Sequence, residues 1–334
     1  MKAGWEFGRS PRVVFGPGVL RRLGEEAAFL GRRVLLVTGA SSLQRSGRLD
    51  EMLRELSRRS LEVHRLGVRG EPSPETVDRA VLEHRGKGID LVVAVGGGSV
   101  LDADKAVSAM LPLGDPVEDY LEGVGKAAHP GKRLPFIAVP TTAGTGSEAT
   151  NNAVISRVGE NGFKRSLRHP SLFPDLALVD PELTLTCPAE LTAACGMDAL
   201  TQLLEAFLSP RSGPLTDALA LSGMEKVREG LLAAVTRANV EALSRRSGEP
   251  GRFLEKYAKA GEVLSGKAVK DGREGCRVLL NTLEKWSEEM RIPRLSAFGI
   301  EEKDLHRLAE ETSLKDNPVT LPAEERFAIL ASRL

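Results

Sequence analysis

The spacing of hydrophobic residues changes about half-way along this 334-residue chain. Up to about residue 182, apolar residues form short, β-branched runs that are separated by glycines and by helical stretches. Such runs are typical of strands that are buried on both faces of a parallel sheet. We expect a hairpin at Trp5–Phe15 and then buried strands at Val34–Thr38, Leu91–Val95, Phe136–Val139 and Leu176–Val179.

From Pro188 onward the apolar residues recur every three or four positions, as in AELTAACGMDALTQLLEAFL, FLEKYAKAGEVL and CRVLLNTLEKWSEEM. This spacing predicts amphipathic helices. The predicted fold class is therefore α/β plus all-α. We expect a Rossmann-like parallel-sheet domain at residues 1–181 and a helical domain at residues 182–334, with the boundary where the last strand ends.

Composition narrows the class of protein. A length of 334 residues with 41% hydrophobic side chains favours two cores, and 46 basic residues balance 46 acidic ones, so no nucleic-acid partner is expected. The three cysteines form no CxxC pair, which favours a reducing compartment. We find no apolar run of membrane-spanning length and no signal-peptide pattern, so we expect a cytoplasmic protein without membrane contact.

A triple glycine, Gly96, Gly97 and Gly98, joins the strand IDLVVAV to a helix that begins near Ser99. Glycines let a ligand approach the backbone closely, and the free amides of a helix start suit a pyrophosphate. The alternative is an ordinary tight turn in which Ser99 and Asp102 form a capping box. The motif alone leaves both interpretations open.

A second polar loop follows the strand Phe136–Val139, and it should lie at the same edge of the sheet. It contains small hydroxyl and glycine residues, namely Thr141, Thr142, Gly144, Thr145, Gly146 and Ser147. Open α/β sheets bind ligands at the carboxyl ends of their strands. Two such loops predict a cradle for one extended ligand, such as a dinucleotide.

Four segments, in this order and at these separations, resemble the iron-containing (group III) alcohol dehydrogenase family: GGGSVLDADKA, PTTAGTGSEAT, LFPDLALVDPELT and GMDALTQLLEA. The resemblance implies a dehydroquinate synthase-like fold of two domains. It also implies an NAD(P)-dependent oxidoreductase that transfers hydride between nicotinamide and a small alcohol or aldehyde, acting as a homodimer. It assigns no catalytic residue here.

The resemblance implies specific cofactor contacts. Gly97, Gly98 and Ser99 match the pyrophosphate-binding residues, following Gly96, and Asp102 matches a residue near the cofactor. Thr141, Thr142 and Thr145 match residues around the phosphates and the nicotinamide. Lys164 and Leu183 match positions beside the cofactor, although Lys164 is also readable as a solvated surface lysine and Leu183 as a core residue.

The choice between NADP and NAD depends on the residues after the strand Val34–Thr38. NAD sites place an acidic side chain there, whereas this chain continues with Gly39, Ala40, Ser41 and Ser42, followed by Arg45. No carboxylate would repel a 2′-phosphate. We therefore expect NADP to be preferred over NAD, with Gly39, the two serines and Arg45 as contacts; the alternative is a flexible turn.

The family holds a divalent metal, iron or zinc, with one aspartate and three histidines. Asp198 matches the aspartate, but Gln202 stands at the first histidine position, and no histidine occurs between His169 and His306. An amide oxygen is a weak ligand for a transition metal. The ligand set is therefore incomplete. The alternative is that Asp198 and Gln202 are ordinary polar residues on an exposed helix face.

In the family, the remaining metal ligands come from a segment that this chain lacks, and the gap falls near residues 228–236. Either evolution removed this segment, or this sequence omits residues of the real polypeptide. VREGLLAAV has the composition of a continuing helix, which favours an omission and predicts an α-carbon separation beyond one peptide in that window. A true deletion would favour a catalytically silent nucleotide-binding or oligomerisation protein. A metal-free reductase of the same superfamily is the third alternative.

Overall fold

The computed structural model describes residues 8–159, 162–227, 251–289, 294–298, 300–311 and 320–334. It divides into an α/β unit, Gly8–Thr192, and a helical unit that includes Ala193–Leu334. The predicted domain boundary at 181–182 stays a prediction. The predicted chain break at residues 228–236 lies outside the described residues.

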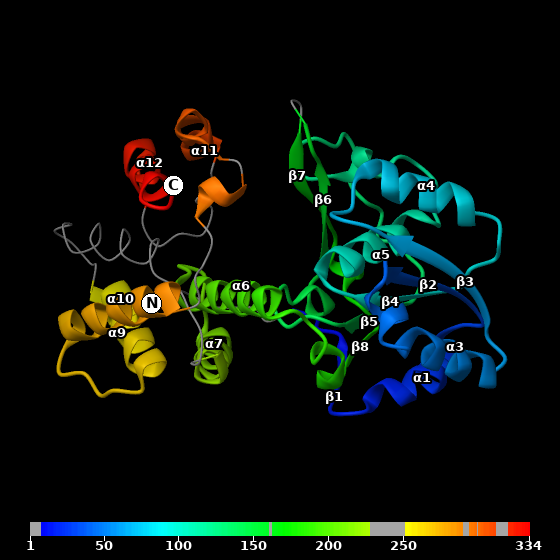
Figure 1. Cartoon of the computed structure of the whole chain (residues 1–334). Coiled ribbons are helices and arrows are strands. Elements are labelled where there is room, and N and C mark those ends of the chain that lie inside the picture. Colours follow the sequence, from blue (N-terminus) through cyan, green and yellow to red (C-terminus); the bar gives the residue numbers. More distant parts are fainter. Residues whose placement is uncertain (1–7, 160–161, 228–250, 290–293, 299, 312–319) are drawn as a thin grey trace. The chain divides into compact units, whose positions relative to one another are not determined.

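The α/β unit is built on a parallel sheet of six strands in the order β1-β8-β5-β4-β2-β3 (Figure 1). The strands are β1 Arg12–Phe15, β2 Arg33–Gly39, β3 Glu62–Val68, β4 Leu91–Gly96, β5 Phe136–Pro140 and β8 Leu176–Val179. Every neighbouring pair is parallel. The four predicted buried strands are confirmed as β2, β4, β5 and β8.

Helices cover both faces of this sheet (Figure 1). They are α1 Leu23–Leu30, α2 Ser42–Arg45, α3 Arg48–Arg58, α4 Pro74–His84 and α5 Gly98–Met110. Val34 and Leu36 of β2 pack with the core under α1 and α3, whereas Leu35 and Val37 pack with the core under α4 and α5. All four side chains are fully buried, which explains why the strand has no polar face.

Three parts of the α/β unit differ from the sequence prediction. Arg12–Phe15 of the predicted hairpin is instead an edge strand that runs parallel to β8. β3 escaped prediction because Glu62, His64 and Arg65 interrupt its apolar pattern, as an edge strand allows. A separate antiparallel hairpin, β6 Asn152–Arg157 and β7 Phe163–Arg168, was also not predicted.

The helical unit confirms the amphipathic pattern. Its helices are α6 Ala189–Leu208, which starts in the α/β unit, then α7 Pro214–Val227, α9 Gly251–Ser265, α10 Gly272–Glu289, α11 Leu305–Glu311 and α12 Ala323–Ala331. Its core includes Leu200, Leu204, Phe207, Met224, Tyr257, Leu279 and Leu283. The fold class predicted from the sequence, a parallel-sheet unit followed by helices, is confirmed.

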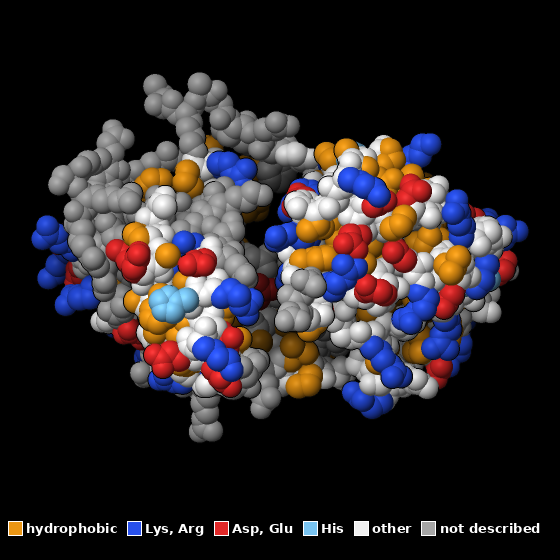
Figure 2. Space-filling model, turned by 90° about the horizontal axis from the view of Figure 1, so that it is seen from above, with side chains coloured by type: hydrophobic (Ala, Val, Ile, Leu, Met, Phe, Trp, Pro, Cys, Tyr) orange, Lys and Arg blue, Asp and Glu red, His pale blue; other side chains and the backbone are white. Residues whose placement is uncertain are grey.

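Basic and acidic side chains are interspersed on the described surface that Figure 2 presents, in keeping with the zero net charge. Among the described residues, the structure contains no helix that is both long and apolar enough to span a membrane.

Candidate functional site

Three neighbouring strands bring the predicted cofactor residues to one edge of the sheet. β4 pairs with β2 on one side and with β5 on the other, and all three strands run in the same direction. Their carboxyl ends, at Gly39, Gly96 and Pro140, therefore lie at the same edge. The glycine turn after β4 and the threonine loop after β5 start side by side, as the sequence predicted.

The start of α5 presents two free backbone donors. Gly97 is its N-cap and carries no capping side chain, and the amides of Gly98 and Ser99 have no hydrogen-bond partner among the described residues. The positive end of the helix dipole adds to these N–H groups. The first turn of α5 is therefore a site for an anionic group such as a phosphate.

Asp102 does not form the alternative capping box with Ser99. Its Oδ1 accepts a hydrogen bond from the Ser147 hydroxyl at 2.5 Å, and its Oδ2 accepts one from the Val154 amide at 3.1 Å. Burial raises the pKa of Asp102, an effect that the neighbouring Lys105 opposes. The carboxylate fastens α5 to the threonine loop and to β6, so its contact with any cofactor is indirect.

The threonine loop is packed directly against the glycine turn. The Thr141 amide donates to the Gly96 carbonyl at 2.9 Å. A Cβ added at Gly98 would lie 2.6 Å from Thr145 Cγ2, and one added at Gly97 would lie 3.4 Å from the Thr142 side chain. Glycine is needed at position 98 because the two loops leave no room for a side chain.

Lys105 is the buried centre of this assembly, with 1% of its surface exposed. Its ammonium group donates to four oxygens, those of the Ser147 carbonyl (2.8 Å), the Ser147 hydroxyl (3.1 Å), the Thr150 hydroxyl (3.0 Å) and the Asn152 carbonyl (2.8 Å). Burial lowers the pKa of Lys105 to about 8, although the Asp102 and Glu148 carboxylates favour its charged form. The lysine holds the end of the threonine loop against α5.

Glu71 links two of the predicted residues. Its carboxylate accepts a hydrogen bond from the Ser99 hydroxyl at 2.7 Å and lies 3.4 Å from the Lys164 ammonium. The Lys164 side chain is 67% exposed. Lys164 is thus largely solvated. Its contact with Glu71, which also binds Ser99, places it next to the glycine turn.

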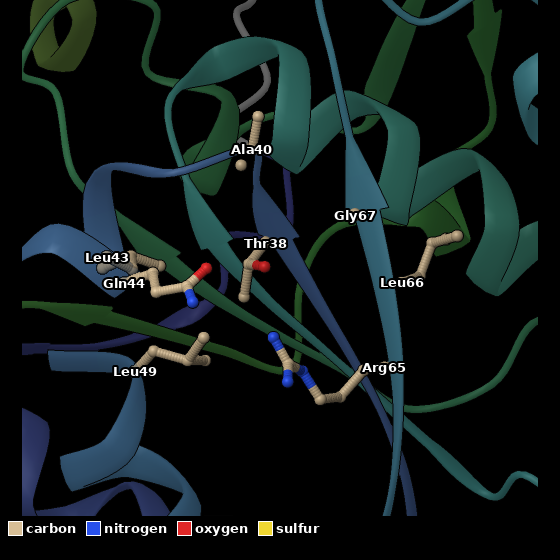
Figure 3. Close-up of a pocket in the computed structure, with 9 residues that line it drawn as sticks. Thr38, Ala40, Leu43, Gln44, Leu49, Arg65, Leu66 and Gly67 are labelled. Carbon is tan, nitrogen blue, oxygen red and sulfur yellow. The ribbon is translucent and has the colours of Figure 1, made fainter. Parts of the chain in front are cut away.

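The remaining cofactor candidates fall in two places. Leu183 is buried in the core with Leu176 and Leu178, which agrees with its alternative interpretation as a core residue. Gly39 lines a pocket of about 190 Å³ that Figure 3 shows between β2, α2, α3 and β3, whereas Ser41 and Ser42 do not line it. Gly39 places this pocket near the start of α5, because a Cβ at Gly39 would contact Val100 of α5 at 3.7 Å.

The metal candidates lie on one exposed face of α6. Asp198 and Gln202 are four residues apart and both are exposed, while Leu200 and Leu204 on the same helix are buried. Within the described part of the chain, no three His, Cys, Asp or Glu side chains come together as a metal site. One carboxylate and one amide do not fit a tightly bound iron or zinc ion, so we assign no chemical step to a metal here.

Comparison with known proteins identifies the family. The sequence profile described as "Iron-containing alcohol dehydrogenase" matches residues 10–181, and that of "Fe-containing alcohol dehydrogenase family, C-terminal" matches residues 192–246. The chain belongs to the iron-containing alcohol dehydrogenase family. The resemblance carried by the glycine turn and the threonine loop is thereby confirmed.

Individual relatives within the iron-containing alcohol dehydrogenases agree. Long-chain-alcohol dehydrogenase 1 of Geobacillus thermodenitrificans is 38% identical over 231 residues, which cover 67% of this chain and 58% of that protein. The probable alcohol dehydrogenase EutG of Escherichia coli is 38% identical over 230 residues, which cover 69% of this chain and 57% of that protein. The chain thus matches less than two thirds of the length of these curated relatives.

Solved structures share the fold of the iron-containing alcohol dehydrogenases. The crystal structure of a 1,3-propanediol oxidoreductase superposes with a TM-score of 0.84 at 25% identity, covering 99% of this chain and 100% of that one. An archaeal alcohol dehydrogenase from a Red Sea brine pool superposes with a TM-score of 0.85 at 23% identity, covering 99% and 100%. The second similarity concerns the fold alone.

Three residues of the site were missed in the sequence. Glu71 and Lys105 act through contacts that span 28 and 42 positions, which no local pattern reveals. Arg65 lines the pocket beside Gly39 from β3, a strand that was not predicted. The one usable signal was the run Asp102–Lys105, which places three charged residues on a helix whose other residues are apolar or small.

Proposed function

We propose that this chain is an NAD(P)-dependent alcohol dehydrogenase or aldehyde reductase that transfers hydride between nicotinamide and a small alcohol or aldehyde. The observation that carries the proposal is the pair of free amides at Gly98 and Ser99, facing the carboxyl edge of the sheet where the threonine loop is fastened. A dinucleotide pyrophosphate matches both the charge and the backbone donors of this site. Two relatives carry names that fit, an NADPH-dependent butanol dehydrogenase and an NAD-dependent methanol dehydrogenase.

The residues divide the work of holding this cofactor. The amides of Gly98 and Ser99 would bind the pyrophosphate, and the close packing of Thr145 on Gly98 sets the wall of the cradle. Thr141 and Thr142 would contact the phosphates and the nicotinamide end. Lys105 and Asp102 would position the threonine loop without touching the ligand. When bound, the nicotinamide supplies the hydride chemistry.

The exposed face of α6 favours two alternative functions, neither of which needs a metal. For the family's divalent ion, iron or zinc, the described residues offer only Asp198 and Gln202 as candidate ligands. Loss of a Lewis acid worth several kcal/mol reduces a rate by orders of magnitude, because each ~1.4 kcal/mol is tenfold. The alternatives are therefore a catalytically silent nucleotide-binding or oligomerisation protein and a metal-free reductase of the same superfamily.

The proposal includes a cytoplasmic homodimer. β1 is an edge strand, and its Val13 and Phe15 side chains are 56% and 71% exposed. An apolar sheet edge of this kind is usually covered, here by a second copy of the chain. None of the three cysteines forms a disulfide, as is usual in a reducing cytoplasm.

Enzyme assays separate these functions. The purified chain is incubated with NADPH or NADH and a panel of short aldehydes, with and without added Zn²⁺ or Fe²⁺, and oxidation of the nicotinamide is followed by absorbance. Turnover that requires added metal supports a metal-dependent dehydrogenase, and turnover in the presence of a chelator supports the metal-free reductase. Cofactor binding without turnover supports the silent protein, and absence of binding overturns the proposal.

A further inference from the structure

The pocket beside Gly39 has a chemistry of its own. It is lined by Thr38, Gly39, Ala40, Leu43, Gln44, Leu49, Arg65, Leu66 and Gly67. Arg65 is the only charged residue among them, and no carboxylate lines the pocket. The guanidinium points into the pocket in the direction of Thr38, with the Gln44 amide on the opposite wall (Figure 3).

The Arg65 guanidinium is available to a ligand. Arg65 is exposed, and it has no ion pair or side-chain hydrogen bond with any residue that the structure describes. Elsewhere in the α/β unit, arginines such as Arg48 and Arg133 are held by carboxylates. An unpaired guanidinium in a pocket without acidic groups is suited to a doubly charged anion, because its planar fork pairs two phosphate oxygens.

Arg45, which the sequence suggested for this role, is already engaged. Its guanidinium donates to the Ser41 hydroxyl at 2.8 Å, and neither residue lines the pocket. Arg65 reaches the pocket instead from β3, where it pairs in register with Leu36 of β2.

Gly39 lies close both to the pocket and to the first turn of α5. This residue ends β2, lines the pocket and lies against Val100 in the first turn of α5. A dinucleotide whose pyrophosphate rests on the Gly98 and Ser99 amides would therefore extend its adenosine half toward Gly39. The absence of a side chain at Gly39 leaves the way open to Arg65.

We propose that Arg65 selects NADPH over NADH by binding the 2′-phosphate of the adenosine ribose in this pocket. The proposal rests on the proposed function, since it needs a dinucleotide on the glycine turn. The step is recognition only and involves no bond change. Gln44 is the second polar side chain that faces the same anion.

The test is a set of variants of the whole chain, titrated with NADPH, NADH, 2′,5′-ADP and 5′-ADP. Arg65→Met removes the guanidinium and Arg65→Lys keeps the charge without the fork. Arg45→Met examines the alternative arginine. Arg32→Met, at the opposite end of β2, is the control for loss of one positive charge. Thermal unfolding confirms that each variant is folded.

We expect Arg65→Met to weaken the binding of NADPH and 2′,5′-ADP about 10- to 100-fold. The dissociation constants of NADH and 5′-ADP should change less than about twofold. Arg65→Lys should bind NADPH about tenfold more weakly than the parent. Arg45→Met and Arg32→Met should bind all four ligands as the parent does. Equal loss of NADPH and NADH in Arg65→Met, or loss of NADPH preference in Arg45→Met, would overturn the role of Arg65. If the parent bound neither dinucleotide, the proposed function itself would fail.

Discussion

The glycine turn of the α/β unit is the cofactor site that we propose, and the exposed face of α6 in the helical unit holds the two metal candidates. The described residues around these two places differ in how many contacts they make. At the turn, the buried Lys105 and the partly buried Asp102 fasten two loops together through several hydrogen bonds. On α6, Asp198 and Gln202 are exposed and have no third ligand among the described residues. The residues that we propose for the cofactor are therefore fastened together by several contacts, whereas the two metal candidates have no third ligand in the part of the chain that the structure describes.

The difference shows that the two functions depend on different kinds of residue. The turn relies on backbone amides, glycines and loop packing, which any substitution at Gly98 disturbs. A metal site relies on a few donor side chains, so a single glutamine at a position where we expect a histidine, as we propose for Gln202, is enough to weaken it. A chain can thus lose metal binding and keep nucleotide binding, and the following changes test that separation.

The largest effect is expected from Lys105→Met, which keeps the aliphatic stem and removes the ammonium. Four oxygens lose their donor, and Asp102 loses a nearby positive charge, so the free energy of unfolding should fall by about 3 kcal/mol. Urea unfolding followed by circular dichroism measures this. Lys164→Met is the control, because its exposed ion pair should be worth less than about 1 kcal/mol. Equal effects would contradict the central role of Lys105.

Gly98→Ala should weaken dinucleotide binding about 10- to 100-fold. Its Cβ would lie 2.6 Å from Thr145 Cγ2, so the threonine loop must move away from the amides that bind the pyrophosphate. Fluorescence titration with NADPH measures the loss. Gly272→Ala is the matched control, since a Cβ there meets nothing within 4 Å. Unchanged NADPH affinity in Gly98→Ala would place the pyrophosphate elsewhere.

Substitution of Asp104 on α5 should change the stability of the fold by a smaller amount, and this change should depend on pH. Asp104 is fully buried, and neither carboxyl oxygen has a partner among the described residues, so burial raises its pKa well above 3.8. Removing this unsatisfied group in Asp104→Ala should stabilise the fold by about 1–2 kcal/mol near neutral pH.

The sign of the pH effect follows from the raised pKa of Asp104. Between pH 3.8 and the raised native pKa, the unfolded state has released the Asp104 proton and the native state retains it. The parent therefore loses stability as pH rises through this window, by up to about 1.4 kcal/mol per unit. The advantage of Asp104→Ala should grow with pH over the same range. Asp104→Asn, which cannot ionise, should lack this dependence; a parallel pH profile in all three proteins would contradict the assignment.

The smallest effect concerns the metal. Protein purified without chelator should contain well under one iron or zinc ion per chain, because Asp198 and Gln202 supply one charge and one neutral oxygen. Elemental analysis measures the content. A stoichiometric ion would show that further ligands complete the site.

The sequence anticipated the parts of this comparison that depend on local patterns. Continuous apolar runs located β2, β4, β5 and β8, because strands buried on both faces need no polar positions. β3 was missed since its edge position tolerates Arg65 and Glu62. The contacts of Lys105 join residues more than 40 positions apart, and such distances are set by tertiary packing rather than by local sequence.

Titration of the chain with NADPH in the presence and absence of EDTA tests the separation of the two halves most directly. We expect one NADPH per chain with the same dissociation constant in both solutions, because the glycine turn and Arg65 need no metal. Binding that EDTA abolishes would show that a metal completes the nucleotide site, and no binding in either solution would show that the glycine turn does not hold a dinucleotide.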